Sequence, residues 1–171
     1  ESRKVVHCWR AGGEFRIRPT SGPGTGDMSS LPRILLVDDH ESDRELAALV
    51  LAGEFDHVDI EQLGSATEFS AAMTSGLFGL VITEADLDWS DGLEVIELVR
   101  DLRPDCPIIL FTESAGTELW NDALRLQVDG YVGKSSGGYV DLPAAVRAAL
   151  FRARRRALAT AKDAPYRRLV E

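Results

Sequence analysis

Short apolar runs that each end in a polar side chain recur along this chain, and they constrain the fold more than any other feature. Ile34–Val37 is followed by two adjacent carboxylates, Asp38 and Asp39, and Leu80–Thr83 is followed by Glu84. Continuous apolar runs of this length are typical of strands that are covered on both faces. The pattern therefore predicts a parallel sheet with acidic residues at the ends of its strands.

Two later runs end in a hydroxyl and in an ammonium group. Ile108–Phe111 leads to Thr112, and the short strand expected at Tyr131 and Val132 is followed by Lys134. The carboxyl ends of parallel strands meet at one edge of the sheet, where such folds bind ligands. Three acids, a hydroxyl and a lysine at one edge would suit a divalent cation and a phosphoryl group.

Helical segments separate the strands. Ser42–Glu45 has the pattern of a capping box at a helix start, and Ser65–Glu68 has the same pattern before a second helix. The remaining expected elements are a strand at Val58–Leu63, helices at Gly92–Leu102 and Thr117–Leu126, and a long helix from about Leu142 with Pro143 in its first turn. This alternation predicts an α/β fold, a flavodoxin-like, doubly wound, five-stranded parallel sheet with five helices, the last one extended.

Four of these stretches carry a resemblance to a known family. They are Ile34–Asp39, Asp91–Val95, Phe111–Thr112 and Asp129–Lys134, in this order. With them, residues 32 to about 150 resemble the receiver domain of two-component response regulators. The resemblance implies a module that takes part in phosphorelay signal transduction.

The resemblance also implies a magnesium site. Asp39 would be the chief direct ligand, Asp38 would act largely through water, and Glu84 would complete the set of carboxylates. Magnesium prefers oxygen ligands and usually keeps several waters, so two or three carboxylates are enough to hold it. Mg²⁺ is accordingly the cofactor that we expect.

Three further residues acquire roles from the resemblance. Lys134 would bridge to a phosphoryl group on the third carboxylate, Thr112 would hydrogen-bond to that group and shift, and Tyr131 would rotate inward as the second switch residue. Such chemistry consists of positioning and charge stabilisation.

Glu84 departs from the family pattern, because the phosphoacceptor at this position is an aspartate in receivers. One more methylene moves the carboxylate outward by about 1.5 Å, and a misplacement of about 1 Å can cost on the order of a hundredfold in rate. We therefore expect a permanent charge that forms an ion pair with Lys134, in a phosphorylation-independent or constitutively biased receiver.

Other functions remain open at this stage. An ordinary phosphorylatable receiver would use Asp86 or Asp88 as its acceptor. A magnesium-dependent aspartyl phosphatase-like enzyme would need a nucleophile and an acid two residues apart after the first strand, which Asp38–His40 does not supply, so we expect no enzyme. A DNA-binding regulator acting through Arg152–Arg156 would lack a helix-turn-helix.

The flanking segments give a three-part organisation. Residues 1–31 are expected to be a disordered leader or tag, with Met28 as one candidate start and Gly12–Arg18 as a candidate last strand of a preceding kinase domain. Residues 32–150 would form the receiver domain. Residues 151–171 would form a helical extension or linker whose last six residues resemble the opening of a PAS domain. Its arginines are either a solvated helix face or part of a signalling helix.

Charge and hydropathy limit the partners. Residues 31–143 hold 23 acidic and 6 basic residues, whereas residues 144–171 hold 8 basic and 2 acidic residues, so a nucleic-acid-binding domain is not expected. The chain has no apolar run of the roughly 20 residues that cross a bilayer, and a cytoplasmic location is expected. The expected partners are a histidine kinase or phosphotransfer protein, an attached sensory or output domain, or a second copy bound through the C-terminal helix.

Overall fold

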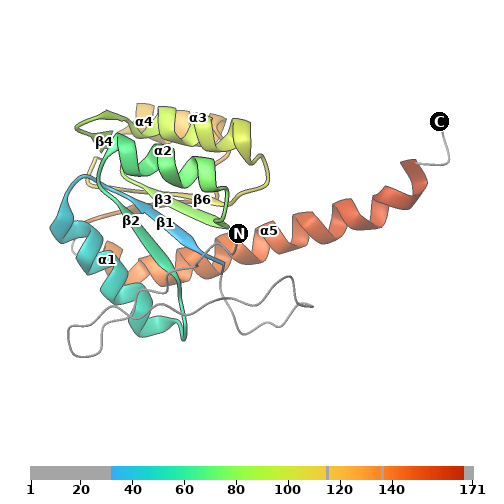
Figure 1. Ribbon diagram of the computed structural model, residues 1–171, viewed down its shortest axis with the longest axis horizontal. Coiled ribbons are helices and arrows are strands. Elements are labelled where there is room, and N and C mark those ends of the chain that lie inside the picture. The colour runs from blue at the N-terminus through green and yellow to red at the C-terminus, as the bar shows by residue number, and fades with distance from the viewer. Residues whose placement is uncertain (1–31, 115, 136, 168–171) are drawn as a thin grey trace.

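Five parallel strands form the central sheet of the computed structural model, which describes residues 32–114, 116–135 and 137–167 (Figure 1). The strands are β1 (Ile34–Val37), β2 (Ile60–Leu63), β3 (Leu80–Thr83), β6 (Ile108–Thr112) and β7 (Gly130–Gly133), in the order β2-β1-β3-β6-β7. The expectations for a leader at 1–31 and for residues 168–171 lie outside the described residues.

The register brings the carboxyl ends of the strands level with one another. Val37 in β1 pairs with Leu63 in β2 and with Thr83 in β3, and Thr112 in β6 pairs with Gly133 in β7. The residues that follow these strands therefore lie along one edge of the sheet, as the sequence pattern predicted.

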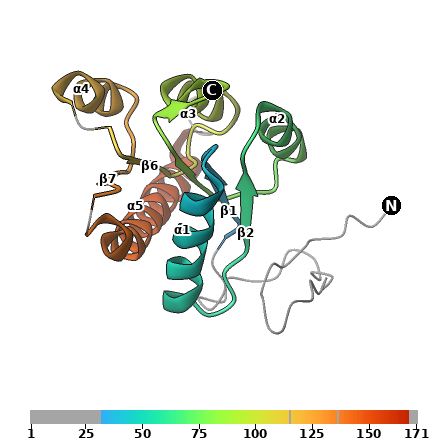
Figure 2. The same cartoon turned by 90° about the vertical axis from the view of Figure 1, so that its left-hand side faces the viewer.

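Helices cover both faces of the sheet. Helices α1 (Glu41–Glu54) and α5 (Gly138–Arg167) lie on one face, whereas α2 (Ala66–Ser75), α3 (Gly92–Leu102) and α4 (Thr117–Arg125) lie on the other (Figures 1 and 2). Buried side chains fill both layers, with Leu51 and Val146 in the first and Phe69, Val95 and Ala123 in the second. The predicted doubly wound fold with five helices is confirmed.

Two predicted helix starts are wrong. Helix α1 begins at Glu41, and its N-cap residue is His40 rather than Ser42; the Asp38 carboxylate accepts the His40 amide at 2.9 Å and so turns the chain before Ser42 is reached. Helix α5 begins at Gly138 rather than near Leu142, which places Pro143 in its second turn. The capping box at Ser65 is confirmed, because the Ser65 side chain accepts the Glu68 amide.

A small hairpin follows β3 that the sequence patterns did not predict. It consists of β4 (Asp86–Leu87) and β5 (Ser90–Asp91), which pair antiparallel. Gly92 then opens α3, and a Cβ atom there would lie 2.0 Å from the carbonyl oxygen of Glu84. Only glycine permits this close approach, which brings the start of α3 against the end of β3.

Helix α5 continues well beyond the sheet, as Figure 1 shows. Two of its arginines return to the body of the domain: Arg156 forms an ion pair with Asp129 at 2.8 Å, and Arg152 donates to the Asp129 carbonyl oxygen. The Asp129 side chain is only 4% exposed and also pairs with Arg100 of α3. The basic segment is therefore partly docked on the domain. The boundary at residue 150 stays a prediction.

Candidate functional site

Lys134 lies at the centre of the polar edge of the sheet. It directly follows β7, and its side chain is 1% exposed. Its Nζ atom lies 2.5 Å from Asp38 Oδ2, 2.6 Å from Glu84 Oε2 and 2.8 Å from Asp43 Oδ2. The pKa of Lys134 is raised: burial alone would lower it, but hydrogen bonds to the three carboxylates outweigh burial.

The Glu84 side chain is held at both oxygens. Oε2 contacts Lys134, and Oε1 accepts the backbone amide of Ala85 at 2.7 Å. The backbone is fixed as well, because the Glu84 amide donates to the carbonyl oxygen of Val37 in the neighbouring strand. The ion pair between Glu84 and Lys134 that the sequence suggested is present.

The adjacent carboxylates have different environments. Asp38 is buried, and burial raises its pKa even though Lys134 and the His40 amide act in the opposite direction. Burial would also raise the pKa of Asp39, but the Asp88 amide and His40 hold that pKa below its usual value. The Asp88 amide donates to Asp39 Oδ2 at 2.7 Å. Asp39 is therefore the carboxylate of this pair that keeps its charge more readily.

The donor atoms at this edge fit a cation. One ligand atom each from Asp38, Asp39 and His40 lie within 4.8 Å of one another. Carboxylate oxygens suit Mg²⁺, which completes its shell with water, so Asp38 and Asp39 fit the expected ion. Glu84 is not a member of this group, and its two oxygens contact Lys134 and the Ala85 amide.

The expected switch residues meet at Ser114. Thr112 is fully buried, and its Oγ1 accepts the Ser114 amide at 3.0 Å. The Tyr131 hydroxyl donates to the Ser114 carbonyl oxygen at 2.7 Å, and its ring packs edge-on against Trp120. Burial and the charge of Glu84 raise the pKa of Tyr131. The arrangement links Thr112 to Tyr131, while their switching roles stay predictions.

The alternative acceptors lie off the strand end. Asp86 is exposed on β4, and its carboxylate accepts the Ser114 hydroxyl. Asp88 is exposed on the hairpin turn, and its backbone amide binds Asp39. Among the described residues, the carboxylates that form ion pairs with Lys134 are those of Asp38, Asp43 and Glu84.

Comparison with known proteins decides the family. Residues 34–147 match the family described as response regulator receiver domain. The chain belongs to this receiver family.

Curated relatives of the receiver are larger proteins. The transcriptional activator protein ExaE of Pseudomonas putida is 32% identical over 114 residues, which are 67% of this chain and 53% of the relative. A protein-glutamate methylesterase/protein-glutamine glutaminase of Agrobacterium fabrum is 31% identical over 128 residues, 71% of this chain and 36% of the relative. The chain thus spans about half the length, or less, of these relatives.

Solved structures show the same fold. A receiver domain protein (CheY-like) from Methanospirillum hungatei JF-1 has a TM-score of 0.66 and 26% identity, covering 74% of this chain and 98% of the other. The signal receiver domain of an HD domain-containing protein from Pseudomonas fluorescens Pf-5 has a TM-score of 0.65 and 25% identity, covering 72% and 98%. These likenesses confirm the flavodoxin-like receiver fold.

Two residues of the receiver's polar edge escaped the sequence patterns. Asp43 was assigned to a capping box, yet its carboxylate binds Lys134. The Tyr139 side chain hydrogen-bonds to Asp43, and burial together with the Asp43 charge raises the pKa of Tyr139 to about 12. The available signal for Asp43 was its position one helical turn after Asp39, which directs it back toward the sheet edge.

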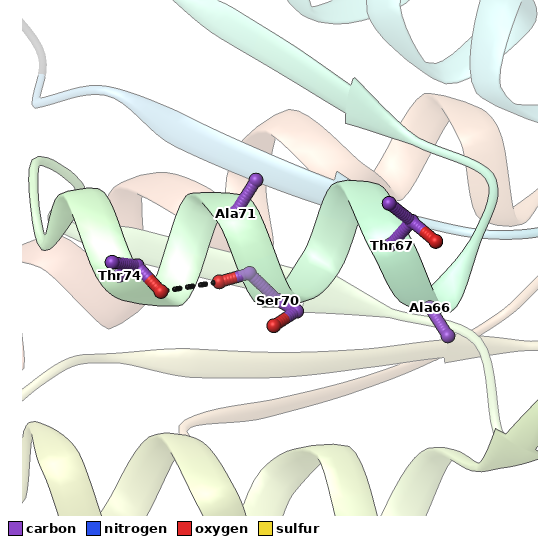
Figure 3. Close-up of a pocket in the computed structure, with 5 residues that line it drawn as sticks. All are labelled: Ala66, Thr67, Ser70, Ala71 and Thr74. Carbon is purple, nitrogen blue, oxygen red and sulfur yellow. Dashed lines mark hydrogen bonds between the residues drawn. The ribbon is translucent and has the colours of Figure 1, made fainter.

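A shallow hollow lies elsewhere on the receiver, on α2. Figure 3 shows its lining of small side chains, in which Thr74 Oγ1 donates to the Ser70 carbonyl oxygen at 2.9 Å. None of the lining residues is charged: Ala66, Thr67, Ser70, Ala71 and Thr74. The chemistry of this receiver is therefore concentrated at the strand ends and not in this hollow.

Proposed function

We propose that this chain is a receiver module of two-component signal transduction whose signalling state does not depend on phosphorylation of Glu84. The observation that carries the proposal is the 2.6 Å contact between Glu84 Oε2 and Lys134 Nζ, two buried groups. The Glu84 carboxylate stands where a receiver has its acceptor, and it already supplies Lys134 with a negative partner.

The geometry opposes attack by Glu84 on phosphorus. Attack requires an aligned oxygen, and a misplacement of about 1 Å can cost on the order of a hundredfold in rate. Both Glu84 oxygens are held by close partners, Lys134 and the Ala85 amide. Local charge acts in the same direction. Asp38 and Asp39 lie at the same edge and repel a dianionic phosphoryl group unless a cation offsets them.

Magnesium has a defined place in this proposal. Asp38 and Asp39 would hold it, and it would supply charge neutralisation at the acidic edge. Asp39 is the stronger candidate for direct contact, because its pKa is lowered whereas that of Asp38 is raised. Glu84 would act through its ion pair with Lys134 instead. Of the three carboxylates expected to bind magnesium, Glu84 is therefore the weakest candidate.

Thr112, Lys134 and Tyr131 keep the roles that the family implies, as parts of the proposal. The hydrogen bonds of Thr112 and Tyr131 to Ser114 support a mechanical link between them. We propose that this link is held in one position by the Glu84 charge, which acts near Tyr131 as well as on Lys134.

The partners follow from the family. We propose contact with a histidine kinase or phosphotransfer protein, or with an attached sensory or output domain, in the cytoplasm and without enzymatic turnover by this module. The described part of the chain has no helix with the length and apolar character that a bilayer crossing needs. Pairing of two copies through α5 stays a prediction, supported by the exposure of Phe151 and Leu158.

Beryllofluoride, which mimics a phosphoryl group on a carboxylate, provides the test. Backbone amide NMR spectra of the unaltered chain are recorded with magnesium alone and then with beryllofluoride added. We expect no further shift at Ala85, Thr112 or Ser114, and saturable shifts in Glu84→Asp. Saturable shifts of these amides in the unaltered chain would overturn the proposal. Shifts confined to Asp86 or Asp88 would favour the ordinary receiver instead.

A further inference from the structure

We propose that Asp43 is a positioning residue that keeps the Lys134 ammonium occupied, so that Lys134 is withheld from an incoming phosphoryl group even when the carboxylate at position 84 is made shorter. This inference rests on the proposed function and adds a second residue to it. Asp43 lies in the first turn of α1, away from the strand ends that carry the family motifs.

The first step of the argument is the number of donors. A lysine ammonium has three N–H donors and no acceptor. Asp38 and Asp43 accept hydrogen bonds from Lys134 at 2.5 and 2.8 Å, and Glu84 forms an ion pair with it at 2.6 Å. Three carboxylates therefore compete with an incoming anion for these donors.

The second step is that Asp43 is itself anchored. Its side chain is 23% exposed, and it is hydrogen-bonded to the Tyr139 side chain in the first turns of α5. The Tyr139 ring packs edge-on against Phe111 at 5.0 Å, and Lys134 Nζ lies 5.7 Å from the Phe111 ring centroid. Asp43 is thus fixed in place by α5 and β6, so that leaving Lys134 would break its hydrogen bond to Tyr139.

The third step is the effect of removing single partners. In Glu84→Asp the carboxylate is drawn back by about 1.5 Å, which opens space for a phosphoryl group. Asp43 and Asp38 still accept hydrogen bonds from two of the three ammonium donors. Replacing Asp43 with asparagine keeps the shape of the side chain and removes the charge that competes for Lys134.

Phosphorylation by acetyl phosphate with magnesium tests the inference. A carboxylate oxygen at position 84 attacks phosphorus, the phosphorus–oxygen bond to acetate breaks, and acetate leaves with the electron pair. The rate of this step is followed by intact mass in Glu84→Asp and in Glu84→Asp/Asp43→Asn. We expect labelling to be about tenfold faster in the double variant, because the loss of one hydrogen bond to a charged group corresponds to a change of about this size. Equal rates, including no labelling of either protein, would overturn the inference.

Two controls separate a positioning role from a general effect. Glu45→Gln in the Glu84→Asp background removes an exposed acid from the same helix, and we expect no acceleration. Asp43→Glu in the same Glu84→Asp background keeps the negative charge at position 43, and we expect its labelling to be as slow as that of Glu84→Asp. Loss of folding cannot imitate the result, because a damaged fold slows labelling.

A further variant separates this inference from the proposed function. Asp43→Asn with Glu84 intact should stay unlabelled, since the Glu84 oxygens remain engaged. Labelling of Glu84 in this variant or in the unaltered chain would overturn the proposed function. The ratio between the two Glu84→Asp proteins would still decide the role of Asp43.

Discussion

Lys134 Nζ lies 2.6 Å from Glu84 Oε2, and both groups are buried at the carboxyl ends of parallel strands. In a receiver, this lysine would meet the negative charge of a phosphoryl group. Here a negative charge next to Lys134 comes from the Glu84 carboxylate, whose side chain is one methylene longer than that of aspartate. In the proposed function, this contact would hold the receiver in one state with an unmodified carboxylate.

Replacing Lys134 with methionine should destabilise the protein strongly. The substitution leaves Asp38, Asp43 and Glu84 without their common cation, and removing one partner of a buried ion pair costs about 3–5 kcal/mol. Urea unfolding measures the change. Arg147→Met is the matched control, because its ion pair with Glu54 is about half exposed and should contribute less than about 1 kcal/mol. Similar losses in the two variants would contradict the buried network.

The stabilising effect of Asp43 should disappear in acid. Burial alone would raise the pKa of Asp43, but its hydrogen bond to Lys134 and the lysine charge hold that pKa below its usual value. A lowered folded-state pKa gives stability that is present above the unfolded pKa and is lost as the pH falls through the folded pKa. Asp43→Asn should therefore reduce the free energy of unfolding at pH 6 by about 1–3 kcal/mol.

Urea unfolding of Asp43→Asn and of the unaltered chain between pH 6 and pH 2.5 measures this dependence. The difference between the two proteins should shrink as the pH falls below 3.8. A difference that stays constant over this range would contradict the ion pair between Asp43 and Lys134.

The extension of α5 should loosen when its contacts with Asp129 are removed. Arg152→Gln/Arg156→Gln breaks the hydrogen bond to the Asp129 carbonyl oxygen and the 2.8 Å ion pair. We expect faster amide hydrogen exchange in residues 152–160, measured by mass spectrometry, because the helix then lacks tertiary support. Arg155→Gln is the control, since the Arg155 guanidinium lies over the Phe151 ring. Equal exchange in all three proteins would show that the Asp129 contacts do not hold the helix.

Magnesium affinity should depend on Asp39. Asp39→Asn removes the carboxylate that fits direct coordination, and we expect at least about tenfold weaker binding in calorimetric titration. Asp88→Asn removes a charge from the same rim, where only the backbone amide of Asp88 contacts Asp39. It should change the affinity less than about twofold at physiological salt. Equal losses in both variants would indicate a diffuse acidic surface instead of a site.

Much of this arrangement could be predicted from the strand pattern alone. Glu84 directly follows the buried strand β3 and Lys134 directly follows β7, and the parallel register places them at one edge. The fold and the shared edge follow from that rule. The expectation that Glu84 and Lys134 form an ion pair came from the resemblance to receivers.

The contribution of Asp43 could not be predicted in this way. Its partner depends on how α1 and α5 pack against the sheet, and the local signal for a capping box pointed to Ser42 instead. The true turn is made by the Asp38 carboxylate, which accepts the His40 amide, a local turn that ends before Ser42 is reached. The docking of Arg152 and Arg156 on Asp129 was missed for the same reason, because it joins elements far apart in sequence.

The mass of the unaltered protein after incubation with acetyl phosphate and magnesium tests the central claim most directly, with Glu84→Asp treated in parallel. The account predicts an unchanged mass for the unaltered chain and a phosphoryl adduct at position 84 in the variant. A stoichiometric adduct mapped to Glu84 in the unaltered chain would contradict it.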